Sequence, residues 1–438
     1  MEKIFVNPPK NDWNEILQRP VFDSRQLEET VAAILADVKV NGDKAVKKYT
    51  AKFDGVEINH FSVSVAEIAE AALLIGSELK AAIGLAKNNI EKFHGAQAFR
   101  EDKIETTPGV LCWRKSIAIE KVGLYIPGGT APLFSTLLML AIPAVLAGCK
   151  EIVVCTPCGK DGKVNPVILY VAQLAGIKNI YKAGGVQAIA AMAYGTETIA
   201  QVNKIFGPGN QYVTCAKQLV NKQGVAIDMP AGPSEVAVYA DETSNPAFVA
   251  ADLLSQAEHG PDSQVVLVAA SQTIVKQVKA EIILQLPLLS RTTIAAEALK
   301  NSRFIVMENV EGAFELLNEY AAEHLIIASG NAMDLCAKVI NAGSVFLGHY
   351  SPESVGDYAA GTNHTLPTNG YAKAYSGVSL DSFVKKVTFQ CLSKEGIQNI
   401  GKAVETMAAA EGLDAHKNAV TLRLAQVAEQ KAGGLKNN

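Results

Sequence analysis

The feature that most constrains this sequence is a regular alternation of short apolar strand-like segments with helical ones, which begins near Ser116. A break rich in Pro and Gly at 227–235 divides the alternation into two series, and the second series ends at 342–348. The strand-like segments of the first series lie at 121–127, 150–157 and 179–184. Strands that alternate with helices form βαβ units, whose strands pair in parallel. The sequence therefore predicts an α/β protein built on mostly parallel sheets.

The segments outside the two series are mostly helical in pattern. Residues 20–110 carry apolar positions at helical spacing, and Ser64 with Glu67 has the spacing of a capping box at a helix start. The last sixty residues, 379–438, contain two helical patterns and are expected to form an arm. We therefore expect two Rossmann-like domains, each with an incomplete and mostly parallel sheet, plus small N- and C-terminal extensions. An ancient duplication of the α/β series is a hypothesis at this point.

Length and charge narrow the classes of function. The chain has 438 residues, enough for two large domains, and its 40 basic and 44 acidic residues give a net charge of −4. This balance argues against nucleic acid or an acidic membrane surface as the main partner. The apolar segment 131–148 contains two prolines, which favours a buried helix over a membrane span. We expect a protein that acts on small molecules.

The cysteines and the first residues indicate a reducing compartment. The seven cysteines have no framework spacing, and the single CxxC pair, Cys155 and Cys158, is followed by turn-forming residues. We interpret that pair as structural, and Cys112 and Cys149 likewise. The N-terminal residues lack the apolar core of a secretory signal. A cytoplasmic location is therefore predicted.

The tripeptide Ala-Glu-His occurs twice, in two different settings. In the first copy a helical pattern ends at Gly260, and Gln256 and His259 lie three residues apart on one helix face. Glu258 points about 100° away from His259 and does not share that face. A histidine near a helix C-terminus is also commonly placed there by the helix dipole alone. Geometry nominates Gln256 and His259 as the candidate pair.

The second copy contains Glu323 and His324, at a junction where a helical pattern runs directly into a strand-like one. In an arbitrary protein such a pair is more often solvated polar surface. When both side chains face a cleft, a carboxylate and an imidazole act as a paired general base and acid. The two copies therefore predict different chemistry.

A long loop after the strand-like segment 344–347 carries three further titratable candidates, Glu353, Asp357 and His364. Turn formation by Asp and Asn explains part of its composition, but a loop of this length favours a function. Loops that follow parallel strands leave the sheet at its carboxyl edge, where open α/β sheets bind ligands. We therefore expect Asp357 at that edge.

A fourth candidate, His416, lies in the first turn of the last helical pattern, after the N-cap candidate Asp414. A helix N-terminus disfavours added positive charge, so it favours the neutral imidazole that binds metals. Gln256, His259, Asp357 and His416 together offer nitrogen and oxygen donors without a thiolate. If they converge, such a set suits a catalytic Zn²⁺ or a similar divalent ion.

Three glycine-rich stretches are expected as turns that let the backbone approach a ligand. They lie at 125–132, 183–190 and 206–210. None of them is a GxGxxG fingerprint or a P-loop, so these residues alone do not predict a dinucleotide site.

Several longer motifs together resemble the histidinol dehydrogenase family. They follow one another from about residue 20 to 430 and include FGPGNQYV, IDMPAGPSE, LLSQAEHGPDSQ and AEGLDAHKNAV. The resemblance implies NAD-dependent oxidation of L-histidinol to L-histidine through bound L-histidinal, the last step of histidine biosynthesis. It also implies a homodimer with one Zn²⁺ per active site, in which the C-terminal arm contributes to the active site of the partner.

The resemblance further implies roles for particular residues. Glu323 and His324 are the implied acid–base pair, with His324 as the base for the alcohol proton and Glu323 as the activator of the water that hydrates the aldehyde. The implied zinc ligands are Gln256, His259, Asp357 and His416. The implied substrate contacts are Ser234, Gln256, His259, His324, Asp357, Glu411 and His416. The implied NAD contacts are Tyr125, Gln187 and Asn210.

The same considerations give expected domain boundaries and two alternatives. The expected parts are an N-terminal extension at 1–20, a larger α/β domain at 21–118 with 235–378, a second α/β domain at 119–234 and a C-terminal arm at 379–438. A zinc hydrolase with Glu323 as base is opposed only by the resemblance. A catalytically inactive ligand-binding relative is opposed by the residue types, because every implied catalytic and metal position is filled as expected.

Overall fold

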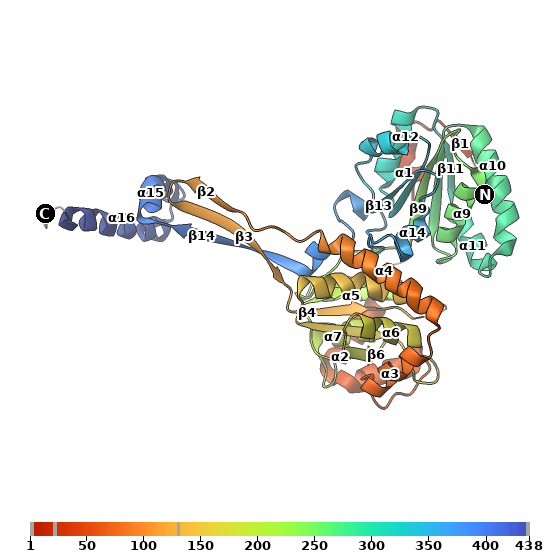
Figure 1. Cartoon of the computed structure of the whole chain (residues 1–438), viewed down its shortest axis with the longest axis horizontal. Coiled ribbons are helices and arrows are strands. Elements are labelled where there is room, and N and C mark those ends of the chain that lie inside the picture. The colour runs from red at the N-terminus through yellow and green to blue at the C-terminus, as the bar shows by residue number, and fades with distance from the viewer. Residues whose placement is uncertain (1–3, 21–23, 129–131, 435–438) are drawn as a thin grey trace. The chain divides into compact units, whose positions relative to one another are not determined.

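The computed structural model describes residues 4–20, 24–128 and 132–434. The chain divides into two compact units (Figure 1). The first comprises Met1–Gln97 and Ile119–Phe383, and the second comprises Ala98–Ala118 and Val384–Asn438. Neither unit is continuous in sequence, so contacts between distant segments define both.

A six-stranded sheet forms the centre of one half of the first unit. Its strand order is β1-β11-β10-β9-β12-β13, and every adjacent pair is parallel. All residues of β9 and β10 are buried, as expected for apolar parallel strands that are covered on both faces. The strands are β1 (Ile4–Val6), β9 (Glu235–Ala240), β10 (Gln264–Ala269), β11 (Arg303–Val306), β12 (His324–Ala328) and β13 (Ser344–Leu347).

Helices cover both faces of this sheet (Figure 1). Successive strand residues point to opposite faces, so Val236 and Val238 pack with one helical layer and Ala237 and Tyr239 with the other. The first layer contains α9 (Pro246–Ala257), α10 (Gln272–Gln285) and α11 (Thr292–Ala298). The second layer contains α1 (Trp13–Ile16), α12 (Val310–Tyr320) and α13 (Ala332–Leu335).

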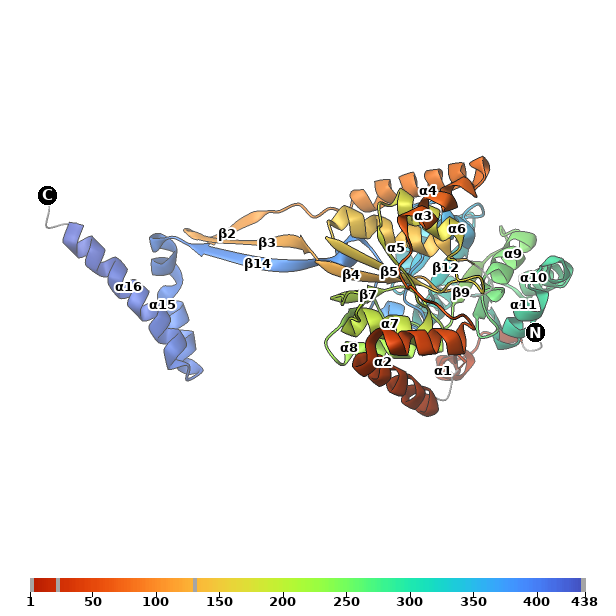
Figure 2. The ribbon, with the colours of Figure 1, turned by 90° about the horizontal axis from the view of Figure 1, so that it is seen from below.

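A five-stranded parallel sheet forms the centre of the other half of the first unit, and Figure 2 shows helices on both of its faces. Its strands, in spatial order, are β6 (Asn179–Lys182), β5 (Glu151–Thr156), β4 (Lys121–Tyr125), β7 (Lys204–Phe206) and β8 (Ala226–Ile227). One layer contains α2 (Ser24–Phe53), α7 (Gly185–Tyr194) and α8 (Gln211–Asn221). The other contains α3 (Val65–Leu73), α4 (Ser77–Gly95), α5 (Phe134–Ala147) and α6 (Pro166–Leu174).

The two sheets share one strand order. Counted from the first strand of each series, the order is 3-2-1-4-5 both in β11-β10-β9-β12-β13 and in β6-β5-β4-β7-β8. This is the order of the dinucleotide-binding Rossmann fold without its sixth strand. The predicted fold class, two incomplete Rossmann-like domains with parallel sheets, is confirmed. The shared order also supports the duplication hypothesis.

Two local predictions hold at the level of side chains. The Ser64 hydroxyl accepts from the Glu67 N–H at 3.1 Å, and the Glu67 carboxylate accepts from the Ser64 N–H at 2.8 Å, which completes a capping box at the start of α3. The apolar segment forms α5, in which every residue from Ser135 to Ala144 is buried. Within the described ranges, no helix has the length and hydropathy needed to cross a membrane.

Three of the expected domain boundaries differ from the structure. The N-terminal segment is part of a domain, because β1 pairs with β11 at the edge of the six-stranded sheet. Helices α2, α3 and α4 do not join residues 235–378, because their apolar faces pack on α7, α6 and α5 beside the five-stranded sheet. The arm begins at Val384 instead of residue 379 and also contains Ala98–Ala118, because its strand pairs with a strand from that segment.

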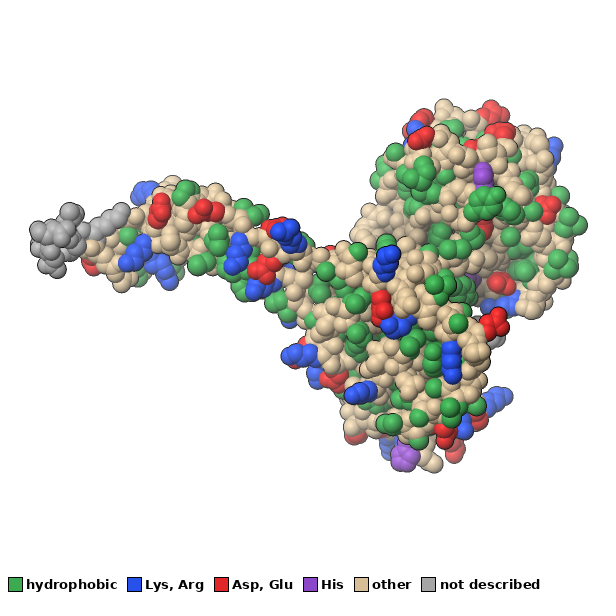
Figure 3. Space-filling model, viewed as in Figure 1, with side chains coloured by type: hydrophobic (Ala, Val, Ile, Leu, Met, Phe, Trp, Pro, Cys, Tyr) green, Lys and Arg blue, Asp and Glu red, His purple; other side chains and the backbone are tan. Residues whose placement is uncertain are grey.

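The second unit is an antiparallel sheet followed by two helices (Figure 2). Its sheet order is β14 (Val384–Leu392), β3 (Val110–Ala118) and β2 (Lys103–Thr107), and its helices are α15 (Lys394–Ala410) and α16 (Asp414–Gly434). Apolar side chains lie among charged ones on the visible face of this unit (Figure 3). On the two helices, Met407 and Leu422 are 66% and 62% exposed.

Candidate functional site

Four segments of the first unit meet at the amino ends of β9 and β12. His324 is the first residue of β12, and Glu235 is the first residue of the neighbouring β9. The last turn of α9 brings Gln256, and α14 (Glu353–Tyr358) brings Asp357. The helix that follows a parallel strand runs back toward the amino edge of the sheet, so the ends of both helices arrive there.

This position corrects one prediction. Asp357 was expected at the carboxyl edge, because its loop follows β13. Its Oδ1 lies 3.5 Å from Nε2 of His324, at the amino edge. The loop leaves β13 at the carboxyl edge, and α14 then returns the chain across the sheet.

His324 lies at the centre of the group, with carboxylates around its ring. Nδ1 lies 3.7 Å from Oε2 of Glu323 and 3.8 Å from Oε1 of Glu353. Nδ1 also lies 3.4 Å from the carbonyl oxygen of Glu235, which only accepts, so Nδ1 is the nitrogen that carries the proton of the neutral ring. Nε2 is buried without a hydrogen-bond partner among the described residues. Such a nitrogen is positioned to exchange a proton with a ligand.

Burial and charge shift the pKa values of the group together. Burial raises the pKa of Glu323 to about 7 and that of Glu353 to about 8. Burial alone would lower the pKa of His324, but the charges of Glu353 and Glu323 and its contact with Asp357 raise it to about 10. Burial also opposes ionisation of Asp357, yet its contact with His324 lowers the pKa of that carboxyl. These groups titrate as one coupled set.

Beside His324 is a group of side chains with the spacing of metal ligands. One ligand atom each from His259, Glu353 and Asp357 lies within 4.8 Å of the others. Gln256 is fully buried, and with its amide nitrogen toward Glu353 it donates to both carboxylate oxygens, at 2.5 and 3.2 Å. That orientation turns the amide oxygen, the ligating atom of a glutamine, away from Glu353. An imidazole with oxygen donors and no thiolate fits Zn²⁺ or a similar divalent ion.

His364 forms hydrogen bonds that hold Asp357 of this group in place. Its Nδ1 donates to the carbonyl oxygen of Asp357 at 2.9 Å, so its Nε2 accepts from the Thr136 hydroxyl at 3.2 Å. Burial lowers the pKa of His364, which keeps the ring neutral as these two bonds require. Thr136 belongs to α5, so this pair of bonds joins the end of α14 to the other half of the first unit.

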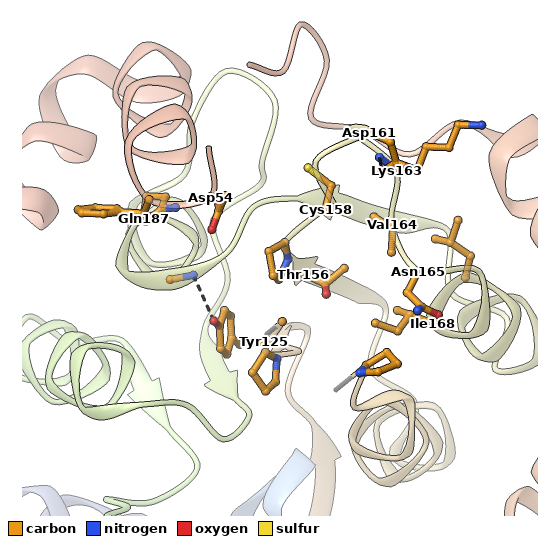
Figure 4. Close-up of a pocket in the computed structure, with 18 of the residues that line it drawn as sticks. Asp54, Tyr125, Thr156, Cys158, Asp161, Lys163, Val164, Asn165, Ile168 and Gln187 are labelled. Atoms are coloured by element: carbon orange, nitrogen blue, oxygen red, sulfur yellow. Dashed lines mark hydrogen bonds between the residues drawn. The ribbon is translucent and has the colours of Figure 1, made fainter. Parts of the chain in front are cut away.

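A cavity of about 1120 Å³ lies at the carboxyl ends of the strands of the five-stranded sheet. Tyr125, Gln187 and Asn210, the three residues expected to contact NAD, all line it. Figure 4 shows Tyr125 and Gln187 in the wall of the cavity. Both amide atoms of Gln187, the Thr156 hydroxyl and one carboxylate oxygen of Asp54 are buried there without partners among the described residues. Buried polar atoms of this kind are normally satisfied, so the cavity fits a ligand with many polar groups.

The walls of this cavity are held by close backbone packing. Asn210 caps α8 by accepting from the N–H groups of Tyr212 and Val213, and the Tyr125 hydroxyl accepts from the Gly185 N–H at 3.1 Å (Figure 4). Burial raises the pKa of Tyr125 to about 12, so this hydroxyl stays neutral. Gly207 has φ 127°, and a Cβ there would lie 2.1 Å from the Tyr125 carbonyl oxygen. Only glycine fits at that position.

The remaining predicted site residues lie in three places. Ser234 is half-buried directly before β9, next to Glu235. Glu411 and His416 belong to the second unit, where both are exposed between the end of α15 and the first turn of α16. Glu258, excluded on geometric grounds, is not part of the metal-type group. The roles of Glu411 and His416 stay predictions.

Sequence reasoning did not assign three residues that the structure brings to the site. Glu353 was a candidate in its loop without a role, although it contacts both His324 and Gln256. Asp252 lies one helical turn before Gln256 on α9, a spacing that was available in the sequence as a signal. Glu235 follows Ser234 in a quoted motif, but only strand pairing reveals that it lies beside His324.

A buried group of titratable side chains and a separate large cavity on a Rossmann-type sheet are typical of an α/β enzyme that acts on small molecules. Comparison with known proteins gives the family. A family model described as histidinol dehydrogenase matches residues 17–424. The chain belongs to the histidinol dehydrogenase family.

The similarity extends over nearly the whole chain. The chain is 61% identical to histidinol dehydrogenase of Bacteroides fragilis over 97% of its own length and 99% of the relative. It is 60% identical to histidinol dehydrogenase of Bacteroides thetaiotaomicron, again over 97% and 99%. A crystal structure of histidinol dehydrogenase from Elizabethkingia anophelis matches with a TM-score of 0.95 and 56% identity, over 97% of this chain and 98% of that one.

Asp252 generates a prediction for the pH dependence of stability. Burial raises the pKa of this carboxyl to about 7, whereas in the unfolded chain it is about 3.9. Between these values folding takes up a proton, so the unfolding free energy falls as pH rises through this window and falls no further above it. Asp252→Asn removes this contribution. With both proteins treated with chelator, the melting temperature of the variant should fall less between pH 4.5 and 7 than that of the parent.

Asp334→Asn is the matched control, because Asp334 is exposed on α13. The melting temperature of this control should change with pH in the same way as that of the parent protein. Parallel melting curves for the parent and Asp252→Asn would contradict the prediction.

Proposed function

We propose that this protein oxidises L-histidinol to L-histidine in two NAD-dependent steps, with L-histidinal held between them, as the last step of histidine biosynthesis. The observation that carries the proposal is the buried Nε2 of His324, which makes no hydrogen bond to a described residue and lies 3.5 Å from Asp357 of the metal-type group, while Nδ1 lies 3.7 Å from Glu323. Family membership supplies the substrate. The balanced overall reaction consumes one water and two hydride acceptors for each L-histidinol that is oxidised.

The proposed zinc ligands are Gln256, His259 and Asp357 of one subunit and His416 of the partner subunit. The donor types and the grouping of His259, Glu353 and Asp357 support this assignment. Zn²⁺ held by these residues would supply a positive charge beside the carboxylates and would help to position the substrate. Glu353 orients the amide of Gln256 and balances charge in the group.

Proton transfer is assigned to Glu323 and His324. A bound divalent cation would compensate the carboxylate charges that hold a proton on His324, and the pKa of His324 would then fall. The neutral Nε2 can then take the proton of the substrate alcohol. The pKa of Glu323, about 7, suits a general base near neutral pH, so Glu323 takes a proton from the water that adds to L-histidinal. The resulting hydrate loses its hydride in the second step, and no thiol is needed.

The NAD site is assigned to the cavity of the five-stranded sheet, with Tyr125, Gln187 and Asn210 as contacts. The partnerless amide of Gln187 and the carboxyl-edge position support this choice. NAD bound there would supply the hydride acceptor for each of the two oxidations.

Ser234 and Glu411 are assigned to the substrate, together with Gln256, His259, His324, Asp357 and His416. Glu411 and His416 act in the site of the partner of a homodimer, which the exposed apolar residues of their unit support. We place the enzyme in the cytoplasm.

The main test is NADH formation with L-histidinol before and after chelation. The protein should release about two NADH per histidinol, lose this activity on chelation and recover it with Zn²⁺. Hydrolysis of an ester or amide without NADH would instead support the zinc hydrolase. Absence of NADH with Zn²⁺ restored would overturn the assignment.

Glu323→Gln should separate the two steps. Supplied L-histidinal should be oxidised about 100-fold more slowly, because a glutamine cannot take the proton of the attacking water, while the first hydride transfer should fall by less than about tenfold. Single-turnover absorbance at the NADH band measures each step. Glu258→Gln, outside the metal-type group, is the matched control and should retain both rates. Equal losses in the two steps would refute the division of roles.

Sharing of sites across a dimer has a test of its own. His416→Ala and His324→Ala are each expected to be inactive. A mixture with exchanged subunits should regain about one quarter of parental activity, because half of randomly paired dimers contain one intact site. Native mass spectrometry verifies the exchange. A mixture that exchanges and stays inactive would argue that each site lies within one chain.

A further inference from the structure

The main chain of one buried residue, Glu235, contacts both members of the acid–base pair. Its N–H donates to Oε2 of Glu323 at 3.0 Å, and its carbonyl oxygen lies 3.4 Å from Nδ1 of His324. The first bond orients the Glu323 carboxylate. The second keeps the proton of the neutral imidazole on Nδ1, which leaves Nε2 of His324 able to accept a proton. A shift of this one peptide would therefore move both reacting side chains.

The side chain of Glu235 is held by Arg19. The guanidinium donates through Nε at 2.5 Å and through Nη2 at 2.9 Å, which is the two-point geometry typical of strong Arg–carboxylate pairs. Glu235 is buried and Arg19 is largely buried. Burial alone would lower the pKa of Arg19, but its bonds to Glu235 raise it, so the guanidinium stays charged.

Arg19 is itself fixed at several points. Its Nη2 also donates to the Tyr320 carbonyl at 2.6 Å, and the guanidinium lies 4.1 Å from the centre of the Tyr320 ring. The Tyr320 hydroxyl donates to Gln264 at 2.9 Å, and Gln264 donates to the carbonyl of Gln18 at 3.1 Å. These bonds close a ring from Arg19 through Tyr320 and Gln264 to the residue before Arg19.

Tyr320 connects this ring to the acid–base pair by a second route. It ends α12, and Glu323 follows three residues later in the same chain segment. The ring therefore holds the peptide that bonds Glu323 and also the segment that carries Glu323. An arrangement that served stability alone would not need to converge on the two reacting residues.

We propose that Arg19 and Glu235 are positioning residues for the reaction, and that the Arg19–Glu235 pair sets the orientation of Glu323 and the tautomer of His324 through the main chain of Glu235. The proposal rests on the acid–base roles given to Glu323 and His324 under the proposed function. We assign Arg19 no contact with substrate or cofactor. Its effect reaches the reaction through the peptide of Glu235 and through the segment from Tyr320 to Glu323.

The test compares Arg19→Gln and Arg19→Lys with the parent enzyme. Arg19→Gln leaves a buried carboxylate without its cation, so the peptide of Glu235 shifts and kcat should fall about 10- to 100-fold, with KM for NAD changed less than about twofold. Arg19→Lys keeps the charge but loses the two-point geometry, so its kcat should lie between that of Arg19→Gln and that of the parent. A folded variant with parental kcat would overturn the proposal, and Arg19→Lys decides if Arg19→Gln does not fold.

Arg303→Gln is the matched control for loosening of the N-terminal segment. Like Arg19, Arg303 is neither fully buried nor exposed. It donates to the carbonyl of Ile16, three residues before Arg19, at 2.7 Å, and it has no bond to Glu235. This variant should lower the melting temperature and leave kcat unchanged. An equal fall of kcat in Arg303→Gln and Arg19→Gln would assign the effect to general loosening and overturn the proposal.

A double variant separates a positioning role from a structural one. If Arg19 acts through Glu323, adding Arg19→Gln to Glu323→Gln should slow L-histidinal oxidation by much less than the product of the two single losses. Fully multiplicative losses would overturn the proposal. If Glu323→Gln alone leaves L-histidinal oxidation intact, the proposed role of Glu323 fails. If Glu323→Gln slows this step and the Arg19 variants do not, only the present inference fails.

Discussion

The parallel pairing of β9 with β12 is the constraint on which the rest of the site depends. Its register sets His324 opposite Val236, so Glu235 lies directly beside His324 at the amino edge. The main chain of Glu235 then meets Glu323 and His324, while its side chain meets Arg19. Because strand pairing moves side chains in steps of one residue, a register shift would send each of these groups to the other face.

Two sheets of the same strand order provide different surfaces. The five-stranded sheet has its large cavity at the carboxyl ends of its strands, where open α/β sheets usually bind nucleotides. The six-stranded sheet has its titratable group at the amino ends, where α9 and α14 return. The Thr136–His364–Asp357 hydrogen bonds join the two halves. The same architecture thus places a large cavity at the carboxyl edge of one sheet and a group of titratable side chains at the amino edge of the other.

Part of this site was predictable from local sequence, because local geometry decided it. Gln256 lies in the last turn of α9 and His259 belongs to the metal-type group, but α9 ends at Ala257, so the predicted helix up to Gly260 is too long. His324 does begin a strand, three residues after the end of α12. The edge at which Asp357 lies was predicted wrongly, because a short helix after the loop reverses its direction. Glu353 and Arg19 were not assigned, because burial and ion pairing depend on segments distant in sequence.

By itself, the sequence determined the α/β class, the two strand–helix series and, through its motifs, the family, since apolar periodicity and turn residues act over short distances. Only the tertiary structure decided which helices cover which sheet, that the N-terminal segment supplies an edge strand and Arg19, and that three carboxylates surround one imidazole. The physical reason is that a pKa, a tautomer and an ion pair are set by neighbours in space. Those neighbours come from strand register and helix return, which no local pattern encodes.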